Sequence, residues 1–292
     1  MIIKKRRLEG KHSSRPKKWG RLEGKLAETT PSKSDGAEVP EESLKMVCGA
    51  FYLPKDNPLK PIGEDAYFIC VEKHAIGVAD GVGGWAQKGV DAGEYARELM
   101  NNAFIAIHQQ TDGVADPKRV LNEAFLNTDA EGSSTACIAM LKDNILHYIN
   151  VGDSGFMIFR ANKLAYQSPI QQRYFNCPFQ LGNGEKSDRP SSAAEETVPV
   201  VPGDIIVLGT DGLLDNVYAA EIEDFLKQET LEGSEDPWHL AYAIAVNLAL
   251  YNSQDKFSYS PFARAAELAN KKHVGGKIDD ITVVVARIVP QN

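Results

Sequence analysis

Acidic residues stand at the ends of apolar, strand-like segments, often with glycine beside them. Asp80 follows one such segment and precedes Gly81, and Asp153 follows a second. Asp211 follows a third, while Asp279 comes just before a fourth. A carboxylate at a strand end projects from a rigid element, and a flanking glycine lets the backbone approach closely. Because converging carboxylates repel one another unless cations neutralise them, this pattern predicts a cation site.

Further acidic residues extend the predicted site. Glu64 and Asp65 begin another strand-like segment, and Asp215 follows Asp211 by four residues. Hard oxygen ligands favour Mg²⁺ or Mn²⁺ over zinc, and the six histidines show no paired ligand spacing. One Asp-Gly pair alone is most often a turn. Five acidic turns attached to strands in one domain shift the interpretation toward a metal site.

Composition excludes several classes of protein. The 292 residues carry a formal net charge of −8, which argues against non-specific nucleic-acid binding. The four cysteines are far apart and form no CxxC pair, which argues against a zinc ribbon, an iron–sulfur centre or a disulfide scaffold. The longest apolar run, residues 241–251, is about half of the roughly 20 residues that a membrane span needs. We therefore expect an intracellular protein without a membrane span.

Charge is distributed unevenly along the chain. Residues 1–25 hold ten Lys/Arg and two Glu, a net of +8, so the remainder carries −16 to give the total of −8. This basic start is compatible with nuclear localisation, with contact to an anionic surface or with a solvated tail. Residues 26–44 are rich in Pro, Ser and Glu, which is typical of a linker. The sequence predicts a disordered tail and linker over residues 1–45 and a folded domain over 46–292.

The folded region is dense in predicted strands. These segments are short, rich in Val, Ile, Phe and Tyr, and bounded by turn residues: 49–53, 66–71, 75–79, 134–141, 145–151, 156–160, 205–209 and 281–289. Helical periodicity covers residues 91–110, 116–127 and 236–251, each beginning at an aspartate suited to cap the helix. Strands come in consecutive runs with helices between the runs. This order favours antiparallel sheets covered by helices over a doubly wound parallel sheet.

Six motifs occur in the order found in one enzyme family. They are GEDAYF (63–68), GVADGVGGW (77–85), EGSSTACIAML (131–141), VGDSGFMI (151–158), VLGTDGLLDN (207–216) and KIDDITVVV (277–285). In this respect the chain resembles the metal-dependent PP2C-type (PPM) serine/threonine protein phosphatases, particularly the PTC7-like branch and its plant relatives. The resemblance covers roughly residues 47–289. It implies an α+β fold, a four-layer αββα sandwich of two antiparallel sheets flanked by helix pairs, with a two-metal site at one edge.

The resemblance also assigns roles to the acidic residues. It implies Mg²⁺ or Mn²⁺ as two ions, with a third, weaker ion position in some members of the family. Asp80 matches the carboxylate that bridges both metals, and Gly81 matches the residue that contributes a backbone carbonyl. The remaining matches are Asp211 and Asp279 for the second metal, Glu64 and Asp65 for the metal-bound waters, and Asp153 with Asp215 for the third ion. The catalytic set implied in this way is Asp80, Asp211 and Asp279.

Four positions depart from the family pattern. Asp280 stands where the family usually has asparagine, which adds charge near the site. Val82 stands where many members have a histidine proposed as general acid, so metal-bound water or another group must protonate the leaving group. Gly155 replaces an arginine that many members carry. Lys60 stands where a phosphate-binding arginine is often found, and it can bind phosphate only as a point charge. We predict a role for Lys60 in substrate binding. The alternative is a solvated loop lysine.

The resemblance implies a phosphatase that hydrolyses phosphoserine and phosphothreonine by in-line attack of a metal-bridging water or hydroxide. Its partners would be phosphorylated proteins, and we expect a monomer that binds no nucleic acid. Two alternatives stay open: a catalytically silent scaffold with the same fold, and a hydrolase of small phosphoesters. Relatives suggest a chloroplast or mitochondrion, whereas the basic start is equally compatible with nucleus or cytosol.

Overall fold

The structure, a computed structural model, describes residues 43–111 and 113–291. Most of the predicted tail, residues 1–42, lies outside the described residues. Strand β1 begins at Leu44, two residues before the predicted start of the folded domain, because Leu44 pairs with Pro290 at the end of the last strand. Among the described residues, no helix is long and apolar enough to cross a membrane.

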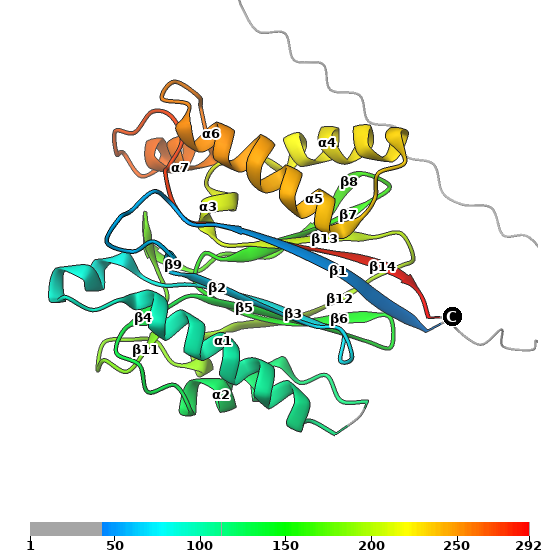
Figure 1. Ribbon diagram of the computed structural model, residues 1–292, viewed down its shortest axis with the longest axis horizontal. Coiled ribbons are helices and arrows are strands. Elements are labelled where there is room, and N and C mark those ends of the chain that lie inside the picture. The colour runs from blue at the N-terminus through cyan, green and yellow to red at the C-terminus, as the bar shows by residue number, and fades with distance from the viewer. Residues whose placement is uncertain (1–42, 112, 292) are drawn as a thin grey trace, which may run out of the picture. The chain divides into compact units, whose positions relative to one another are not determined.

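Two five-stranded antiparallel sheets form the centre of the fold (Figure 1). Sheet I contains, in order, β1 (Leu44–Leu53), β14 (Ile281–Pro290), β13 (Ile205–Gly209), β7 (Gly155–Arg160) and β8 (Lys163–Gln167). Sheet II contains β12 (Ala194–Pro199), β6 (Ile145–Val151), β5 (Ala136–Lys142), β3 (Ala75–Asp80) and β2 (Asp65–Cys70). Two small ribbons pair β4 (Ser133–Ser134) with β11 (Leu181–Gly182) and β9 (Gln172–Tyr174) with β10 (Cys177–Pro178).

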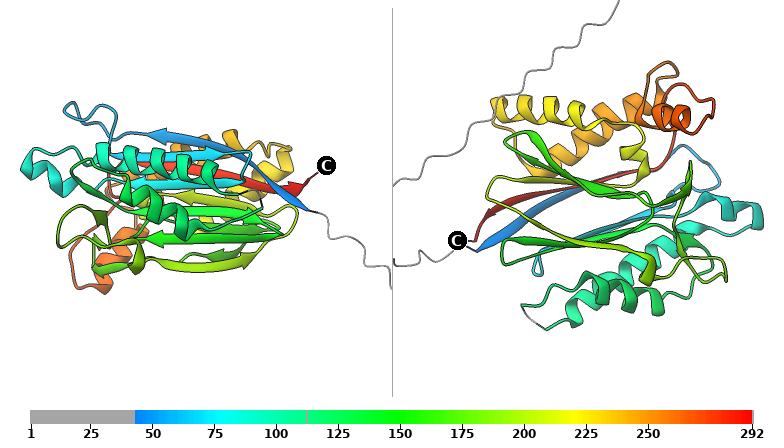
Figure 2. Two further views of the ribbon diagram at one scale, coloured as in Figure 1. Left: turned by 90° about the horizontal axis from the view of Figure 1, so that it is seen from below. Right: turned by 180° about the vertical axis from the view of Figure 1, so that it is seen from behind.

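Helices cover the outer face of each sheet, which gives four layers (Figures 1 and 2). Against sheet II pack α1 (Ala92–Gln109) and α2 (Pro117–Leu126). On the other side lie α3 (Asp211–Leu214), α4 (Ala219–Glu232), α5 (Pro237–Ala243), the π-helical segment η3 (Ile244–Leu250), α6 (Tyr251–Gln254) and α7 (Pro261–Leu268). Two 3₁₀ turns, η1 (Gly83–Lys88) and η2 (Pro190–Ser192), complete the elements. The predicted αββα sandwich is confirmed.

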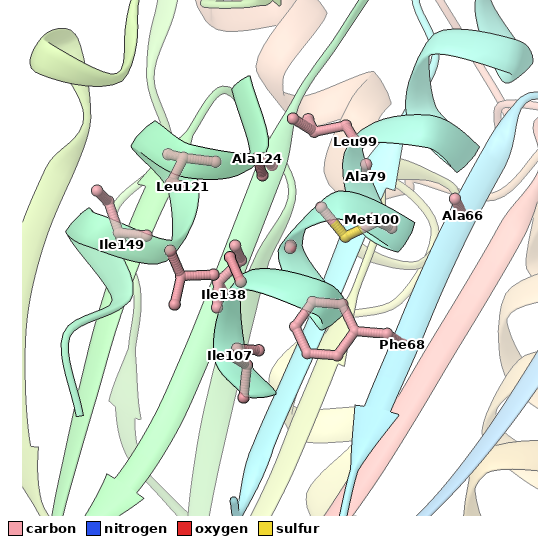
Figure 3. Close-up of a cluster of buried hydrophobic side chains, with 14 of the residues drawn as sticks. Ala66, Phe68, Ala79, Leu99, Met100, Ile107, Leu121, Ala124, Ile138 and Ile149 are labelled. Carbon is pink, nitrogen blue, oxygen red and sulfur yellow. The ribbon is translucent and has the colours of Figure 1, made fainter. Parts of the chain in front are cut away.

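Alternation along the strands explains the layering. In β5, Ile138 and Met140 face the cluster under α1 and α2, whereas the intervening Ala139 faces the cluster between the sheets. Successive strand side chains point to opposite faces, so each central strand supplies two cores at once. Figure 3 shows the first of these clusters, in which Phe68 of β2 lies close to Met100 and Ile107 of α1.

Most predicted elements are confirmed, but α4 and α7 were not predicted and one predicted helix differs in form. The three predicted capping aspartates each accept a backbone hydrogen bond at a helix start: Asp91 from Gly93, Asp116 from Arg119 and Asp236 from His239. The stretch 236–251, predicted as one regular helix, instead passes from α5 into the π-helical η3 and then α6. Apolar spacing does not distinguish these forms, because it reports only which side of the helix is buried.

Candidate metal centre

Asp65 and Asp80 face each other across neighbouring strands of sheet II. Asp65 is the first residue of β2 and pairs in register with Asp80, the last residue of β3. The Oδ2 atom of buried Asp65 accepts hydrogen bonds from the hydroxyls of Thr210 and Thr282, both at 2.7 Å. Thr282 lies in β14 of sheet I and Thr210 directly follows β13 of the same sheet, so these bonds join the two sheets at the carboxylate. The other oxygen, Oδ1, is buried and has no hydrogen-bond partner among the described residues.

Glycines allow the acidic turns to approach one another. The backbone N–H of Gly81 donates to the carbonyl of Glu64 at 3.0 Å, and a Cβ at Gly81 would lie 2.7 Å from that oxygen. At Gly212, a Cβ would lie 1.9 Å from the carbonyl oxygen of Asp280. Real Cβ atoms do not approach oxygens so closely. Glycine is therefore required where α3 meets the residues that precede β14.

Three of the predicted ligands converge on the ammonium group of Lys277. Its Nζ lies 3.0 Å from Asp215 and 3.1 Å from Asp279, and it forms a short contact with Asp211. Burial alone disfavours the charged amine, but these three carboxylates outweigh it and raise the pKa of Lys277 well above its usual value. Asp211 and Asp215 at α3 and Asp279, which precedes β14, thus share the ammonium group of Lys277.

A second lysine lies among the remaining carboxylates. The Nζ atom of Lys55 is 2.8 Å from Asp279, 3.6 Å from Glu64 and 3.7 Å from Asp280. Glu64 is also in contact with the ammonium of Lys60. Lys277 and Lys55 together lower the pKa of Asp279 although its burial acts in the opposite direction.

Asp280 anchors the backbone beside the site. Its two oxygens accept the N–H groups of Lys55 at 2.7 Å and Glu64 at 2.8 Å. Only 2% of its surface is exposed. From the sequence, Asp280 is predicted to add a charge near the site. The structure shows that this charge holds the ends of the 55–64 loop.

Asp153 lies between β6 and β7, and Gln172 of β9 contacts it. The side-chain amide of Gln172 donates to Asp153 Oδ2 at 2.8 Å, while Oδ1 is buried without a hydrogen-bond partner among the described residues. Burial, together with nearby Asp211, raises the pKa of Asp153 to about 7. Burial also raises the pKa of Asp215 to about 7, despite the opposing effect of Lys277. These two carboxyls therefore resist ionisation unless a cation stabilises them.

Asp80 and Asp65 show the same resistance more strongly. Burial raises the pKa of Asp80 well above its usual range, and the charges of Asp211, Asp65 and Asp279 raise it further. Burial and Asp280 likewise raise the pKa of Asp65, against the two threonine hydrogen bonds. The mutual effects of these side chains show that the predicted acids lie close together.

The residues present fit divalent ions of the Mg²⁺ or Mn²⁺ type. All the acidic donors are carboxylate oxygens, which such ions prefer. Three of these oxygens, in Asp65, Asp153 and Asp211, are buried without hydrogen-bond partners among the described residues. An unpartnered buried acceptor is costly, and a bound cation would remove that cost.

Sequence reasoning missed four side chains that complete this centre: Lys55, Lys277, Thr210 and Thr282. Lys277 stands two residues before Asp279, which was a usable signal, whereas nothing in the sequence points to Lys55. Arg173, the neighbour of Gln172 in β9, pairs with Asp188 at 2.6 Å.

Comparisons with known proteins agree with the fold and identify the family. The family model described as Stage II sporulation protein E (SpoIIE) matches residues 71–289. Probable protein phosphatase 2C 55 of Arabidopsis thaliana is 48% identical over 257 residues, which are 88% of this chain and 55% of that protein. Protein phosphatase PTC7 homolog fig of Drosophila mojavensis is 39% identical over 246 residues, or 77% of this chain and 78% of that protein.

One solved structure is similar in sequence as well as in fold. The X-ray structure of the photosystem II phosphatase PBCP has a TM-score of 0.76 and 32% identity, covering 83% of this chain and 98% of that one. A helix-covered double sheet with carboxylates at one edge defines a metal-dependent phosphatase fold. This chain belongs to the PP2C family of metal-dependent protein phosphatases. It spans 55% of the length of probable protein phosphatase 2C 55 and 59% of that of probable protein phosphatase 2C 80, both of Arabidopsis thaliana.

Proposed function

We propose that this chain is a metal-dependent protein serine/threonine phosphatase. The observation that carries the proposal is the convergence of Asp211, Asp215 and Asp279 on one ammonium group, beside buried carboxylate oxygens that lack hydrogen-bond partners. Phosphate is an anion, and a cluster of carboxylates attracts it only when cations reverse the local charge. Membership of the PP2C family supports the same reaction.

Each acidic residue has a proposed part in holding the ions. Asp80, Asp211 and Asp279, with the carbonyl of Gly81, would hold two Mg²⁺ or Mn²⁺ ions. Glu64 and Asp65 would orient water, and Asp153 with Asp215 would form a third, weaker position. When bound, such ions neutralise phosphate charge and lower the pKa of water, which makes it nucleophilic toward phosphorus.

The chain's own residues fix the acidic groups before any ligand arrives. Thr210 and Thr282 hold one oxygen of Asp65 and leave the other free to accept a hydrogen bond. The N–H groups of Lys55 and Glu64 hold Asp280, which keeps the Glu64 carboxylate beside the lysines. The Val82 side chain has no ionisable proton, so water or another group must protonate the departing serine or threonine oxygen.

Hydrolysis assays test this function directly. Wild type should hydrolyse an aryl phosphate and a phosphothreonine peptide with Mn²⁺ but not with EDTA. Asp80→Asn should lose at least 100-fold in kcat/KM, whereas the exposed turn variant Asp143→Asn should match wild type. Activity that survives EDTA or the Asp80 change would exclude the metal mechanism. Metal binding without hydrolysis would indicate a scaffold, and a strong preference for small phosphoesters would indicate a hydrolase of metabolites.

Lys60 would contribute a positive charge to substrate binding. Its ammonium contacts Glu64, which lies in the acidic cluster. Lys60 therefore adds a positive charge beside the proposed phosphate position. Lys60→Ala should raise KM for a phosphopeptide several-fold with little effect on kcat. The exposed Lys118→Ala serves as the matched control. An unchanged KM would remove this role.

The proposed assembly and location follow the family. We expect a monomer that acts on phosphorylated proteins, and light scattering of the full chain tests this. An organelle, either chloroplast or mitochondrion, is the proposed compartment, since one similar structure is a photosystem II phosphatase. Fluorescent fusions of the full chain and of a chain lacking residues 1–45 test the compartment. Nuclear fluorescence of the full chain would instead support the basic segment as a nuclear signal.

A further inference from the structure

Three side chains of metal-ligating type meet at the other end of β2 from Asp65. They are Cys70 at the end of β2, Glu72 in the turn to β3 and His108 near the end of α1. Cys70 Sγ lies 3.9 Å from Glu72 Oε2 and 3.9 Å from His108 Nε2, and all three atoms are within 4.8 Å of one another. Five residue steps along β2 lead from Asp65 to Cys70, which is about 17 Å at 3.3 Å per residue. The group is thus separate from the acidic centre.

The histidine ring is already oriented as a ligand. Nδ1 of His108 lies 2.9 Å from the carbonyl of Phe104, one helical turn earlier, and only a protonated Nδ1 can donate to that oxygen. This bond leaves the lone pair on Nε2, the atom that faces Cys70. In metal sites, a hydrogen bond from the other ring nitrogen commonly fixes the liganding histidine in this way. The Phe104 ring packs against the imidazole, with centroids 4.5 Å apart, and further restricts it.

The Cys70 sulfur forms the buried side of this group. Cys70 is 1% exposed, whereas Glu72 and His108 are exposed, so the group opens to solvent on one side only. Burial raises the pKa of the Cys70 thiol, and the nearby Glu72 carboxylate adds to this, against a backbone hydrogen bond from Lys73. The thiol is therefore protonated at neutral pH, and a metal ion that binds the sulfur must displace that proton to solvent.

The two separations from the sulfur are close to those of tetrahedral coordination. Metal–ligand lengths of about 2.3 Å to sulfur and 2.0–2.1 Å to nitrogen place two tetrahedral ligand atoms roughly 3.6 Å apart. The observed 3.9 Å differs by a few tenths of an ångström, which small side-chain rotations can close. One thiolate, one imidazole and one carboxylate form a donor set suited to zinc rather than to Mg²⁺ or Mn²⁺.

We propose that Cys70, Glu72 and His108 form a second metal site, which binds Zn²⁺ with water in the fourth position. The ion would join the C-terminal end of α1 to the β2–β3 turn. Both elements lead to the acidic centre: β2 begins at Asp65, and near the start of α1 Arg97 donates to the carbonyl of Gly63 at 3.1 Å. The ion would therefore stabilise the framework of the phosphatase without taking part in its reaction. The sequence does not predict this site, because the three ligands follow no known zinc spacing.

Cobalt spectroscopy tests the site apart from the acidic centre. The full chain is saturated with Mn²⁺ to fill the carboxylate cluster and is then titrated with Co²⁺. A near-ultraviolet thiolate-to-cobalt absorption should appear with one equivalent, since none of the proposed phosphatase ligands is a cysteine. The band should be absent in Cys70→Ser and weakened at least tenfold in affinity in His108→Gln and Glu72→Gln. These last two residues are exposed, so their substitution leaves folding intact. Cys177→Ser, the matched thiol control, should retain the band.

Thermal unfolding gives the second reading. Zn²⁺ added to the Mn²⁺-loaded chain should raise the Tm of wild type and Cys177→Ser by several degrees, but not that of His108→Gln. Hydrolysis with Mn²⁺ should stay within twofold of wild type in His108→Gln. The cobalt band and the Tm shift can be measured whether or not the chain proves to be an active phosphatase. Absence of the cobalt band from wild type, or its persistence in both His108→Gln and Glu72→Gln, would overturn the proposal. In either case the three side chains would form a hydrogen-bonded surface cluster only.

Discussion

The ammonium group of Lys277 lies 3.1 Å from the carboxylate of Asp279, two residues further along the chain. The same ammonium contacts Asp211 and Asp215 on the other side of the site. The fold therefore supplies a positive charge of its own where the proposed ions would bind. A lysine in this position compensates carboxylate repulsion and at the same time opposes the entry of divalent cations.

Removal of this charge should strengthen metal binding. In Lys277→Gln, the carboxylates of Asp211, Asp215 and Asp279 lose their ammonium partner, so Mn²⁺ no longer competes with it. We expect the dissociation constant for Mn²⁺ to fall at least tenfold, about 1.4 kcal/mol, by isothermal titration. Lys227→Gln, on the exposed side of α4, is the matched control. Equal or weaker Mn²⁺ binding in Lys277→Gln would show that the lysine helps to organise the ligands.

The two threonines at Asp65 should matter for stability. Thr210→Val and Thr282→Val each remove one hydrogen bond to a buried carboxylate while preserving the shape of the side chain. Each should lower the free energy of unfolding by about 1–3 kcal/mol in urea denaturation. Thr197→Val, on exposed β12, should change it by less than about 0.5 kcal/mol. If the two changes proved as mild as the control, Asp65 would not depend on these bonds.

The sequence indicated the strands and acidic turns because both depend on local signals. The Asp143–Asn144 hairpin follows from two residues that tolerate positive φ, here +49° and +60°. By contrast, Thr210 and Thr282 reach Asp65 only because β13 and β14 pair in one register and the two sheets then stack. Helix α4 was missed because only Ile222 and Leu226 are buried along its 14 residues, so its apolar periodicity is weak. Contacts that depend on stacking between distant segments leave no local pattern.

Asp280 provides a test of the backbone anchor. Asp280→Asn changes one acceptor oxygen into an NH₂ group, which then faces the N–H of Lys55 or Glu64 instead of accepting from it. One backbone donor is thereby left unsatisfied in a buried position. The free energy of unfolding should fall by about 1–3 kcal/mol, measured by urea denaturation without divalent ions. Asp255→Asn, in the loop before α7, is the matched control, whose free energy of unfolding is measured in the same way. A neutral Asp280→Asn would mean that the 55–64 loop can readjust, as the asparagine usual in the family would require.

His74 should make stability depend on pH. It lies in the β2–β3 turn with φ of +46°, and its Nδ1 is buried without a hydrogen-bond partner among the described residues. Burial, with a smaller effect of the Lys45 charge, lowers the pKa of His74 below its ordinary value of 6.5. The unfolded chain therefore binds the proton more readily than the folded chain does. The resulting stability is complete above pH 6.5 and declines as pH falls toward the lowered pKa.

His74→Asn suits positive φ and cannot titrate, so its free energy of unfolding should fall less steeply than that of wild type from pH 7 to 5. Urea denaturation at several pH values measures both slopes. All other titrating groups are the same in the two proteins, so the difference between the slopes reports the effect of His74. Lys45→Gln should give an intermediate slope, and identical slopes for wild type and His74→Asn would contradict this role of the histidine.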